Sequence, residues 1–138
     1  MRQVFHLFER GLTSVSFNEV SSEWVFRFDD DVALQAIAPW RVVVDGRIVI
    51  GSCDEGHAFG LGDAIDARQQ VRDAVGTSPV SRAWTDGPGD LHVQFGEIVT
   101  LHVFNHSAGY EGWQWFGPGE RHVVALGGGR VHESESLE

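Results

Sequence analysis

The chain has 138 residues, a formal net charge of −10 and a single cysteine, which fits one domain, residues 1–138, without an internal disulfide. Because a phosphate backbone repels an acidic surface, the charge argues against nucleic-acid binding and favours either plain solubility or a basic protein partner. No apolar run approaches the roughly 20 residues of a membrane span, and the first ten residues lack the apolar core of a signal peptide. We therefore expect a cytoplasmic protein without a membrane partner, and the lone Cys53 fits that reducing compartment.

In the first half of the chain, apolar and polar residues alternate with the period of half-buried strands. The Asp29–Asp31 run predicts an exposed turn. The clearest hairpin spans Trp40–Ile50, where Asp45-Gly46 predicts a two-residue type I′ turn. The strands expected before this hairpin are 12–17, 23–28 and 32–38.

The second half of the chain begins with a glycine-rich loop, 51–62, that matches no phosphate-binding motif. One helix is expected over about 64–75, with Asp63 as its N-cap and Gly76 after its last turn. Gly96-Glu97 predicts a two-residue type II′ hairpin turn. The strands expected after the helix are 80–85, 91–95, 98–104, 110–116, 121–126 and 130–132.

These elements predict a mainly β fold of the α+β type. We expect an antiparallel meander of about nine or ten short strands that forms a sandwich or a partly open barrel, with the helix near 64–75 packed across it. The acidic tail 133–138 is expected to be disordered or partly vector-derived.

The stretch 107–119 concentrates aromatic residues around one carboxylate, Glu111. If 110–116 forms a strand, Glu111 shares a face with Trp113 and Trp115. A carboxylate between aromatic rings must accept hydrogen bonds or pair with an arginine. We therefore expect Glu111 to be a buried acceptor that fixes this strand to the preceding loop.

Catalytic and metal-binding patterns are weak. Cys53 and His57 have a conceivable spacing in the glycine-rich loop, but no second ligand pair follows, so we expect neither a metal nor a cofactor. The neighbours Asp54 and Glu55 disfavour a reactive thiolate at Cys53. We expect no catalytic residue and consider a non-enzymatic role more plausible. The candidate binding residues are Asp54, His57, Phe59, Tyr110, Glu111 and Trp113.

Four motifs resemble a family of small uncharacterised bacterial domains over about residues 12–131. The motifs are Pro39-Trp40-Arg41, Gly51–Gly56 with Phe59-Gly60-Leu61, Gly89-Asp90-Leu91 with Phe95, and Ser107–Trp113 with the glycine run near 127. Related small domains occur near polymorphic-toxin systems, where compact acidic proteins act as immunity factors. The resemblance therefore implies an immunity-type role but transfers no catalytic residue.

Three functions remain open from the sequence. The first is a binding module, such as an immunity-type inhibitor, for a basic protein partner. The second is a small-ligand binder or hydrolase-like enzyme that uses the 51–62 loop with Glu111. The third is a homodimer that buries an exposed edge strand, because short β domains must cover or charge their edges.

Overall fold

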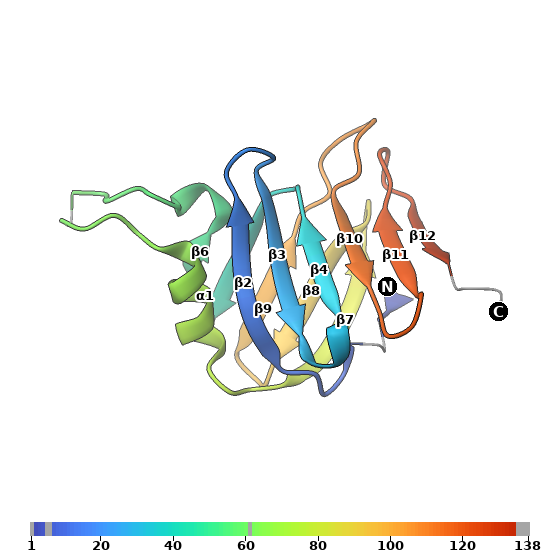
Figure 1. Cartoon of the computed structure of the whole chain (residues 1–138), viewed down its shortest axis with the longest axis horizontal. Coiled ribbons are helices and arrows are strands. Elements are labelled where there is room, and N and C mark those ends of the chain that lie inside the picture. Colours follow the sequence, from blue (N-terminus) through green and yellow to red (C-terminus); the bar gives the residue numbers. More distant parts are fainter. Residues whose placement is uncertain (1, 5–6, 61, 135–138) are drawn as a thin grey trace.

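Two six-stranded antiparallel sheets face each other and are not closed into a barrel (Figure 1). The structure, a computed structural model, describes residues 2–4, 7–60 and 62–134. The mainly β sandwich with one helix is confirmed, although its sheets hold more strands than the nine or ten that the sequence predicted.

Both sheets are built mostly from neighbouring antiparallel strands, as a meander requires. In sheet A the order is β1 (Arg2–Gln3), β7 (Val80–Asp86), β8 (Asp90–Phe95), β9 (Val99–Val103), β5 (Trp40–Val44) and β6 (Arg47–Gly51). In sheet B the order is β12 (Val131–Ser134), β11 (His122–Ala125), β10 (Trp113–Phe116), β4 (Ala33–Ala36), β3 (Glu23–Phe28) and β2 (Leu12–Asn18). The chain passes from sheet B to sheet A between β4 and β5.

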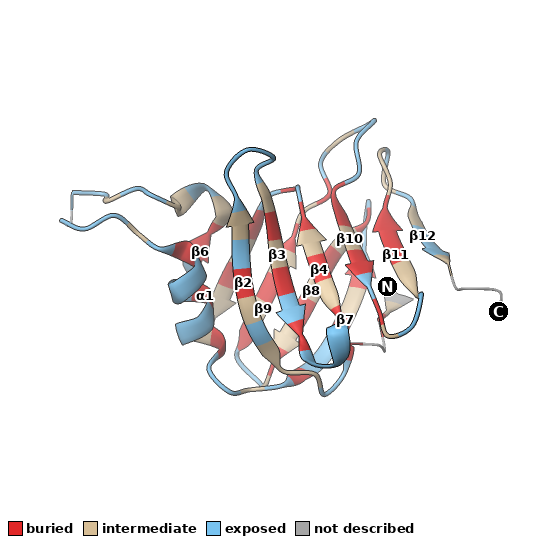
Figure 2. Ribbon diagram, in the orientation of Figure 1, coloured by how far each residue is buried: buried red, intermediate tan, exposed pale blue. Residues whose placement is uncertain are grey.

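The core is formed by the inner faces of the two sheets (Figure 2). Trp24 and Phe26 of β3, which the sequence placed on one face, are both buried. Trp113 and Trp115 of β10 are also buried together. Because each large side chain removed from water contributes roughly 2 to 3 kcal/mol, these alternating aromatic residues supply much of the driving force for folding.

Helix α1 (Ala67–Val75) starts three residues later than predicted. Its N-cap is Asp66, whose carboxylate accepts a hydrogen bond from Gln69 N–H at 3.4 Å, and the assignment of Asp63 is wrong. The reason is that both backbone polar groups of Ile65 are hydrogen-bonded to residues 56–57 of the preceding loop. The chain becomes free to turn into a helix only at Asp66.

The end of α1 agrees with the sequence. Gly76 follows the last turn with a φ of 58°, a conformation that glycine adopts without strain. The buried face of the helix carries Ala67, Val71 and Val75. This face packs against β2, β5 and β6, so α1 covers the side of the sandwich where β2 and β6 form the sheet edges (Figure 1).

Two hairpins in sheet A differ in how well their register could be predicted. In the β5–β6 turn, Asp45 and Gly46 have φ angles of 48° and 81°, as a type I′ turn requires. Such a turn predicts that Val43 pairs with Ile48, which is confirmed, and that Val42 pairs with Val49, which is wrong, because the register shifts and Val42 pairs with Ile50. The β8–β9 turn has three residues between the paired Phe95 and Val99, so the predicted two-residue turn is wrong. The extra residue shifts the pairing of β8 with β9 by one position, so each residue of β8 lies opposite a different residue of β9 from the one predicted.

The last part of the chain also departs from the prediction. Strand β10 begins at Trp113 rather than at residue 110. Glu133 and Ser134 of the expected acidic tail form the end of β12, whereas 135–138 lie outside the described residues. Within the described ranges no helix has the length and apolar character of a membrane span.

Candidate functional site

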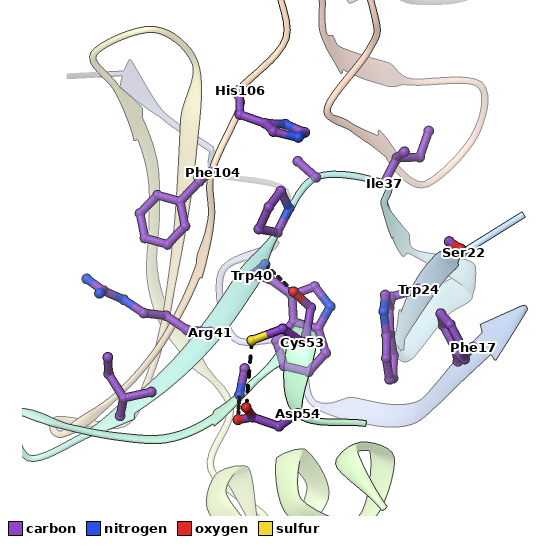
Figure 3. A pocket seen from close by; sticks show the side chains of 15 residues that line it. Phe17, Ser22, Trp24, Ile37, Trp40, Arg41, Cys53, Asp54, Phe104 and His106 are labelled. Carbon is purple, nitrogen blue, oxygen red and sulfur yellow. Dashed lines mark hydrogen bonds between the residues drawn. The ribbon is translucent and has the colours of Figure 1, made fainter. Parts of the chain in front are cut away.

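A cavity of about 570 Å³ opens at one end of the sandwich (Figure 3). Side chains from both sheets, from the β4–β5 connection and from the 3-10 helix Ser52–Asp54 surround it. Its volume lies within the range of roughly 300 to 1,000 Å³ that is typical of ligand pockets. The lining residues that matter below are Trp24, Trp40, Arg41, Ser52, Cys53, Asp54 and Phe104. We call this cavity the end pocket.

One wall of the end pocket is a rigid cluster of aromatic rings. Trp24 and Trp40 pack edge to face, with ring centroids 5.0 Å apart and an angle of 83° between their planes. Phe17 stacks on Trp24 at 4.3 Å, and Phe26 packs edge to face with Trp40 at 5.3 Å. The buried indole nitrogen of Trp40 has no hydrogen-bond partner and lies on the side of its ring that faces Trp24 (Figure 3). Such packing fixes the ring positions and gives the pocket a preformed apolar wall.

The loop at the base of the pocket is held by side chains that accept backbone hydrogen bonds. Ser52 Oγ accepts from Trp40 N–H at 3.1 Å, and Asp54 Oδ2 accepts from Gly51 N–H at 2.8 Å. Cys53 is exposed between them, and its Sγ makes only a 3.7 Å contact with Asp54 Oδ1. Ser52 and Asp54 therefore shape the loop, whereas Cys53 leaves its thiol at the pocket surface (Figure 3).

Arg41 lies on the opposite side of the pocket from the tryptophans (Figure 3). Its guanidinium carbon sits 5.0 Å from the centroid of the Phe104 ring, a cation–π geometry. Its Nε is buried and has no hydrogen-bond partner, and no carboxylate among the described residues pairs with it. A cation that an aromatic ring holds in place, and whose terminal N–H groups make no hydrogen bond to the described residues, is suited to an incoming acceptor.

A row of rings continues from Arg41 across the outer face of sheet A. The strand register places Trp84, His92, His102 and Arg41 side by side on β7, β8, β9 and β5. Trp84 stacks on His92 at 5.1 Å, and His92 meets His102 edge to face at 4.9 Å. His102 in turn stacks on Phe104 at 6.0 Å. We call this row the ring ladder, and its Phe104 end borders the end pocket.

A chain of hydrogen bonds runs through the ring ladder. His92 Nε2 lies 2.7 Å from Asp86 Oδ1, and His92 Nδ1 lies 2.7 Å from His102 Nδ1. Since a carboxylate only accepts, Nε2 of His92 carries a hydrogen, and a single hydrogen is shared between the two Nδ1 atoms. The arrangement therefore requires that His92 and His102 are not both doubly protonated.

The charges around the two histidines favour this state. Burial, reinforced by His92 and Arg41, lowers the pKa of His102 from 6.5 to about 4. The hydrogen bond from His92 lowers the pKa of Asp86 below its usual value. His102 is consequently neutral and Asp86 ionised near pH 7.

The structure separates the residues that the sequence singled out for binding. Asp54 lines the end pocket, with one oxygen engaged by Gly51 N–H. His57 and Phe59 are exposed on the loop that projects beside α1, where their rings stack at 5.7 Å (Figure 1). Neither is part of the pocket lining. Trp113 is buried and donates its indole N–H to the Gly89 carbonyl at 2.8 Å, so its visible role is structural.

The prediction that Glu111 is a buried acceptor is wrong. Glu111 is exposed and precedes β10, and its neighbour Tyr110 is 81% exposed. Ser107 Oγ accepts hydrogen bonds from the N–H groups of Gly109 and Tyr110 at 3.1 and 2.9 Å, so two of the donors expected for Glu111 are already used. The alternation of Trp113 and Trp115 was extended two positions too far, beyond the start of the strand.

Several motif residues meet instead at Asn105, which ties three loops together. Its Nδ2 donates to the carbonyls of Pro88 and Leu126 at 3.0 and 3.1 Å, and its backbone N–H donates to Asp90 Oδ1 at 2.9 Å. A Cβ at Gly112 would lie 2.4 Å from Asn105 Oδ1, so only glycine fits there. The glycine-rich motifs near these loops therefore have a structural explanation.

Sequence reasoning identified neither the ring ladder nor a binding role for Arg41. The alternation in the two strands could have predicted the ladder, because His92 and His102 both lie between buried residues and therefore both point away from the core. The predicted two-residue turn between β8 and β9 set His92 opposite Leu101, which hid the pair. No cluster of three or more potential ligands suited to a metal occurs within residues 2–4, 7–60 and 62–134.

Comparison with known proteins gives a family but no activity. Neither the curated proteins nor the solved structures contain a match to this chain. The model of a family of unknown function, DUF6188, matches residues 11–135, which include the end pocket, the ring ladder and the Asn105 junction. The chain therefore belongs to the DUF6188 family of unknown function.

Proposed function

We propose that this protein is a non-catalytic binding module and that the end pocket is where it binds. The observation that carries the proposal is a preformed cavity of about 570 Å³ with an aromatic wall on one side and Arg41, over Phe104, on the other. Ligand sites typically combine such an apolar lining with a few fixed polar groups. The occupant is an apolar group of a ligand or partner.

The surroundings of the pocket support binding more than catalysis. Ser52 and Asp54 both accept hydrogen bonds from backbone N–H groups of the pocket walls, which gives each a structural role in the loop. Cys53 has no histidine among its hydrogen-bond partners in the described chain. A cysteine nucleophile is typically activated by a neighbouring histidine, and the described pocket residues form no such hydrogen-bonded pair.

The exposed thiol of Cys53 allows a direct test. The only cysteine of the chain lines the pocket, so a benzyl methanethiosulfonate reagent should fill the cavity, whereas a methyl reagent should leave most of it open. Each reagent forms a mixed disulfide with Cys53 and releases methanesulfinate. Unmodified, S-methylthio and S-benzylthio protein would be incubated with the small-molecule fraction of a source-cell lysate, and the retained compounds identified by mass spectrometry. We expect compounds that the first two forms retain and the S-benzylthio form loses. Equal retention by all three forms, or retention by none, would contradict the proposal.

An immunity-type role against a basic protein stays a prediction that rests on the net charge of −10 and on the family resemblance. Co-purification of the chain with the product of a neighbouring gene at low salt, lost at high salt, would support it. Such a partner would place an apolar side chain in the end pocket, so S-benzylthio modification of Cys53 should also weaken that complex.

A homodimer through a sheet edge is the remaining candidate. At the β6 edge, Ile48 and Val49 remain 62% and 43% exposed although α1 packs against this strand, and exposed apolar side chains on an edge strand favour pairing with a second copy. Light scattering at micromolar concentration would detect the dimer, and a monomeric mass at every loading would exclude it.

A further inference from the structure

We infer that the end pocket recognises a carboxylate attached to an apolar body, and that Arg41 is the residue that binds the carboxylate. This inference rests on the proposed binding function and adds the chemical class of the ligand. It predicts that the apolar body packs against the wall formed by Trp24 and Trp40, while the carboxylate meets the guanidinium beside Phe104.

The first support is the state of Arg41 in an acidic protein. The chain has twenty Asp and Glu side chains against ten Lys and Arg, yet none of the described carboxylates pairs with Arg41. Its Nε is buried without a hydrogen-bond partner. Because Nε is closed to solvent, the ligand would meet the terminal Nη groups, which make no hydrogen bond to the described residues. The planar fork of guanidinium N–H groups matches the two oxygens of a carboxylate.

The second support is that the neighbours of Arg41 do not compete with a ligand for it. Phe104 lies against the guanidinium and has no acceptor atom. On the adjacent strand, Nδ1 of His102 is hydrogen-bonded to His92 at 2.7 Å. The carboxylate of Asp86, at the far end of the same hydrogen-bond chain, is bonded to His92. The ring ladder thus leaves Arg41 as the cation at the border of the pocket.

The third support concerns the charge that the ligand can carry. Asp54 also lines the pocket, where its carboxylate accepts a hydrogen bond from Gly51 N–H. One guanidinium opposite one carboxylate suits a singly charged anion better than a phosphate dianion, which Asp54 would repel more strongly. The aromatic wall in turn favours a ligand whose remaining atoms are apolar.

A matched pair of probes tests the inference. The probes are phenylacetate, 3-phenylpropionate and 4-phenylbutyrate, each compared with its uncharged primary amide. Binding is followed through the tryptophan indole N–H resonances in ¹H–¹⁵N NMR spectra. Trp24 and Trp40 line the pocket, whereas Trp113 lies outside its lining with its N–H bonded to Gly89, so Trp113 serves as an internal control. At least one carboxylate should shift the first two resonances and leave that of Trp113 unchanged, and it should bind at least about tenfold more tightly than its amide.

Two arginines on the same sheet face provide the matched variants. Arg82 lies 4.4 Å above the Trp84 ring, in the same kind of cation–π contact as Arg41 but outside the pocket lining. Arg41→Gln should weaken carboxylate binding by roughly tenfold to a hundredfold and leave amide binding unchanged, whereas Arg82→Gln should affect neither. Arg41→Lys, which keeps the charge but loses the fork, should fall between wild type and Arg41→Gln.

The outcomes separate this inference from the proposed function. If carboxylates and amides both shift Trp24 and Trp40 with equal affinity, the pocket binds apolar groups but the role of Arg41 is wrong. An equal loss in Arg41→Gln and Arg82→Gln would also overturn it, because the effect would then come from net charge. If no probe of either kind shifts Trp24 and Trp40, the proposed binding function itself fails.

Discussion

Replacing His102 with glutamine should remove a loss of stability that the wild-type protein suffers between about pH 6.5 and pH 4. His102 has a folded-state pKa of about 4, against 6.5 for an unperturbed histidine. Between these values the unfolded chain binds the proton and the folded chain does not, so wild-type stability falls as the pH falls. Glutamine does not titrate, and its amide can still donate a hydrogen bond to His92.

The size of the effect follows from the groups that face His102. Burial, the adjacent His92 and the Arg41 guanidinium oppose its protonation, while Asp86 favours it. A fall in pKa from 6.5 to about 4 corresponds to at most roughly 3 kcal/mol, and partial solvent exposure reduces this to about 2 kcal/mol. Asp86 does not interfere in this window, because the pKa of its carboxyl is lowered and its contribution is lost only at more acidic pH.

Urea denaturation of both proteins at pH 7, 5.5 and 4 measures the effect. The free energy of unfolding of the wild type should drop by about 2 kcal/mol more than that of His102→Gln, because all other titrating groups are shared. His132→Gln, at an exposed position of β12, is the matched control and should follow the wild type. A gap between wild type and His102→Gln that stays constant from pH 7 to pH 4 would refute the reasoning.

Three further predictions concern the β9–β10 loop and the start of β10. Glu111→Gln, at an exposed site, should change the melting temperature by no more than about 2 °C, and a larger loss would show that the carboxylate is structural after all. Gly112→Ala places a Cβ 2.4 Å from Asn105 Oδ1 and should destabilise by about 1 to 3 kcal/mol in urea denaturation; an unchanged midpoint would mean that Asn105 can move aside. Trp113→Phe leaves the Gly89 carbonyl without its 2.8 Å hydrogen bond and should cost about 1 to 3 kcal/mol, whereas wild-type stability in this variant would argue against that bond.

The fold could be predicted from the sequence because its signals are local. Alternation placed Trp24 and Phe26 on the inner face of a strand, and both are buried. Asp45-Gly46 predicted a turn with two positive φ angles, which occurs at 48° and 81°. These patterns depend only on the period of a strand and on which residues tolerate a left-handed backbone.

The candidate site could not be predicted because it depends on register and on long-range contacts. One additional residue in the β8–β9 turn decides that His92 faces His102. Arg41 joins Phe104 and the pocket only when β5 pairs with β9. The prediction for Glu111 was wrong because it relied on a local pattern alone. The alternation of the strand was extended into the preceding loop, where Ser107 Oγ already accepts the hydrogen bonds of the N–H groups of Gly109 and Tyr110.

The most direct test of the end pocket as a carboxylate site is a crystal structure of the protein with the probe that binds most tightly. We predict that the phenyl ring packs against Trp24 and Trp40 and that a carboxylate oxygen lies within about 3 Å of an Arg41 nitrogen. A probe bound elsewhere on the protein, or one whose carboxylate points to solvent while Arg41 contacts only Phe104, would contradict the account.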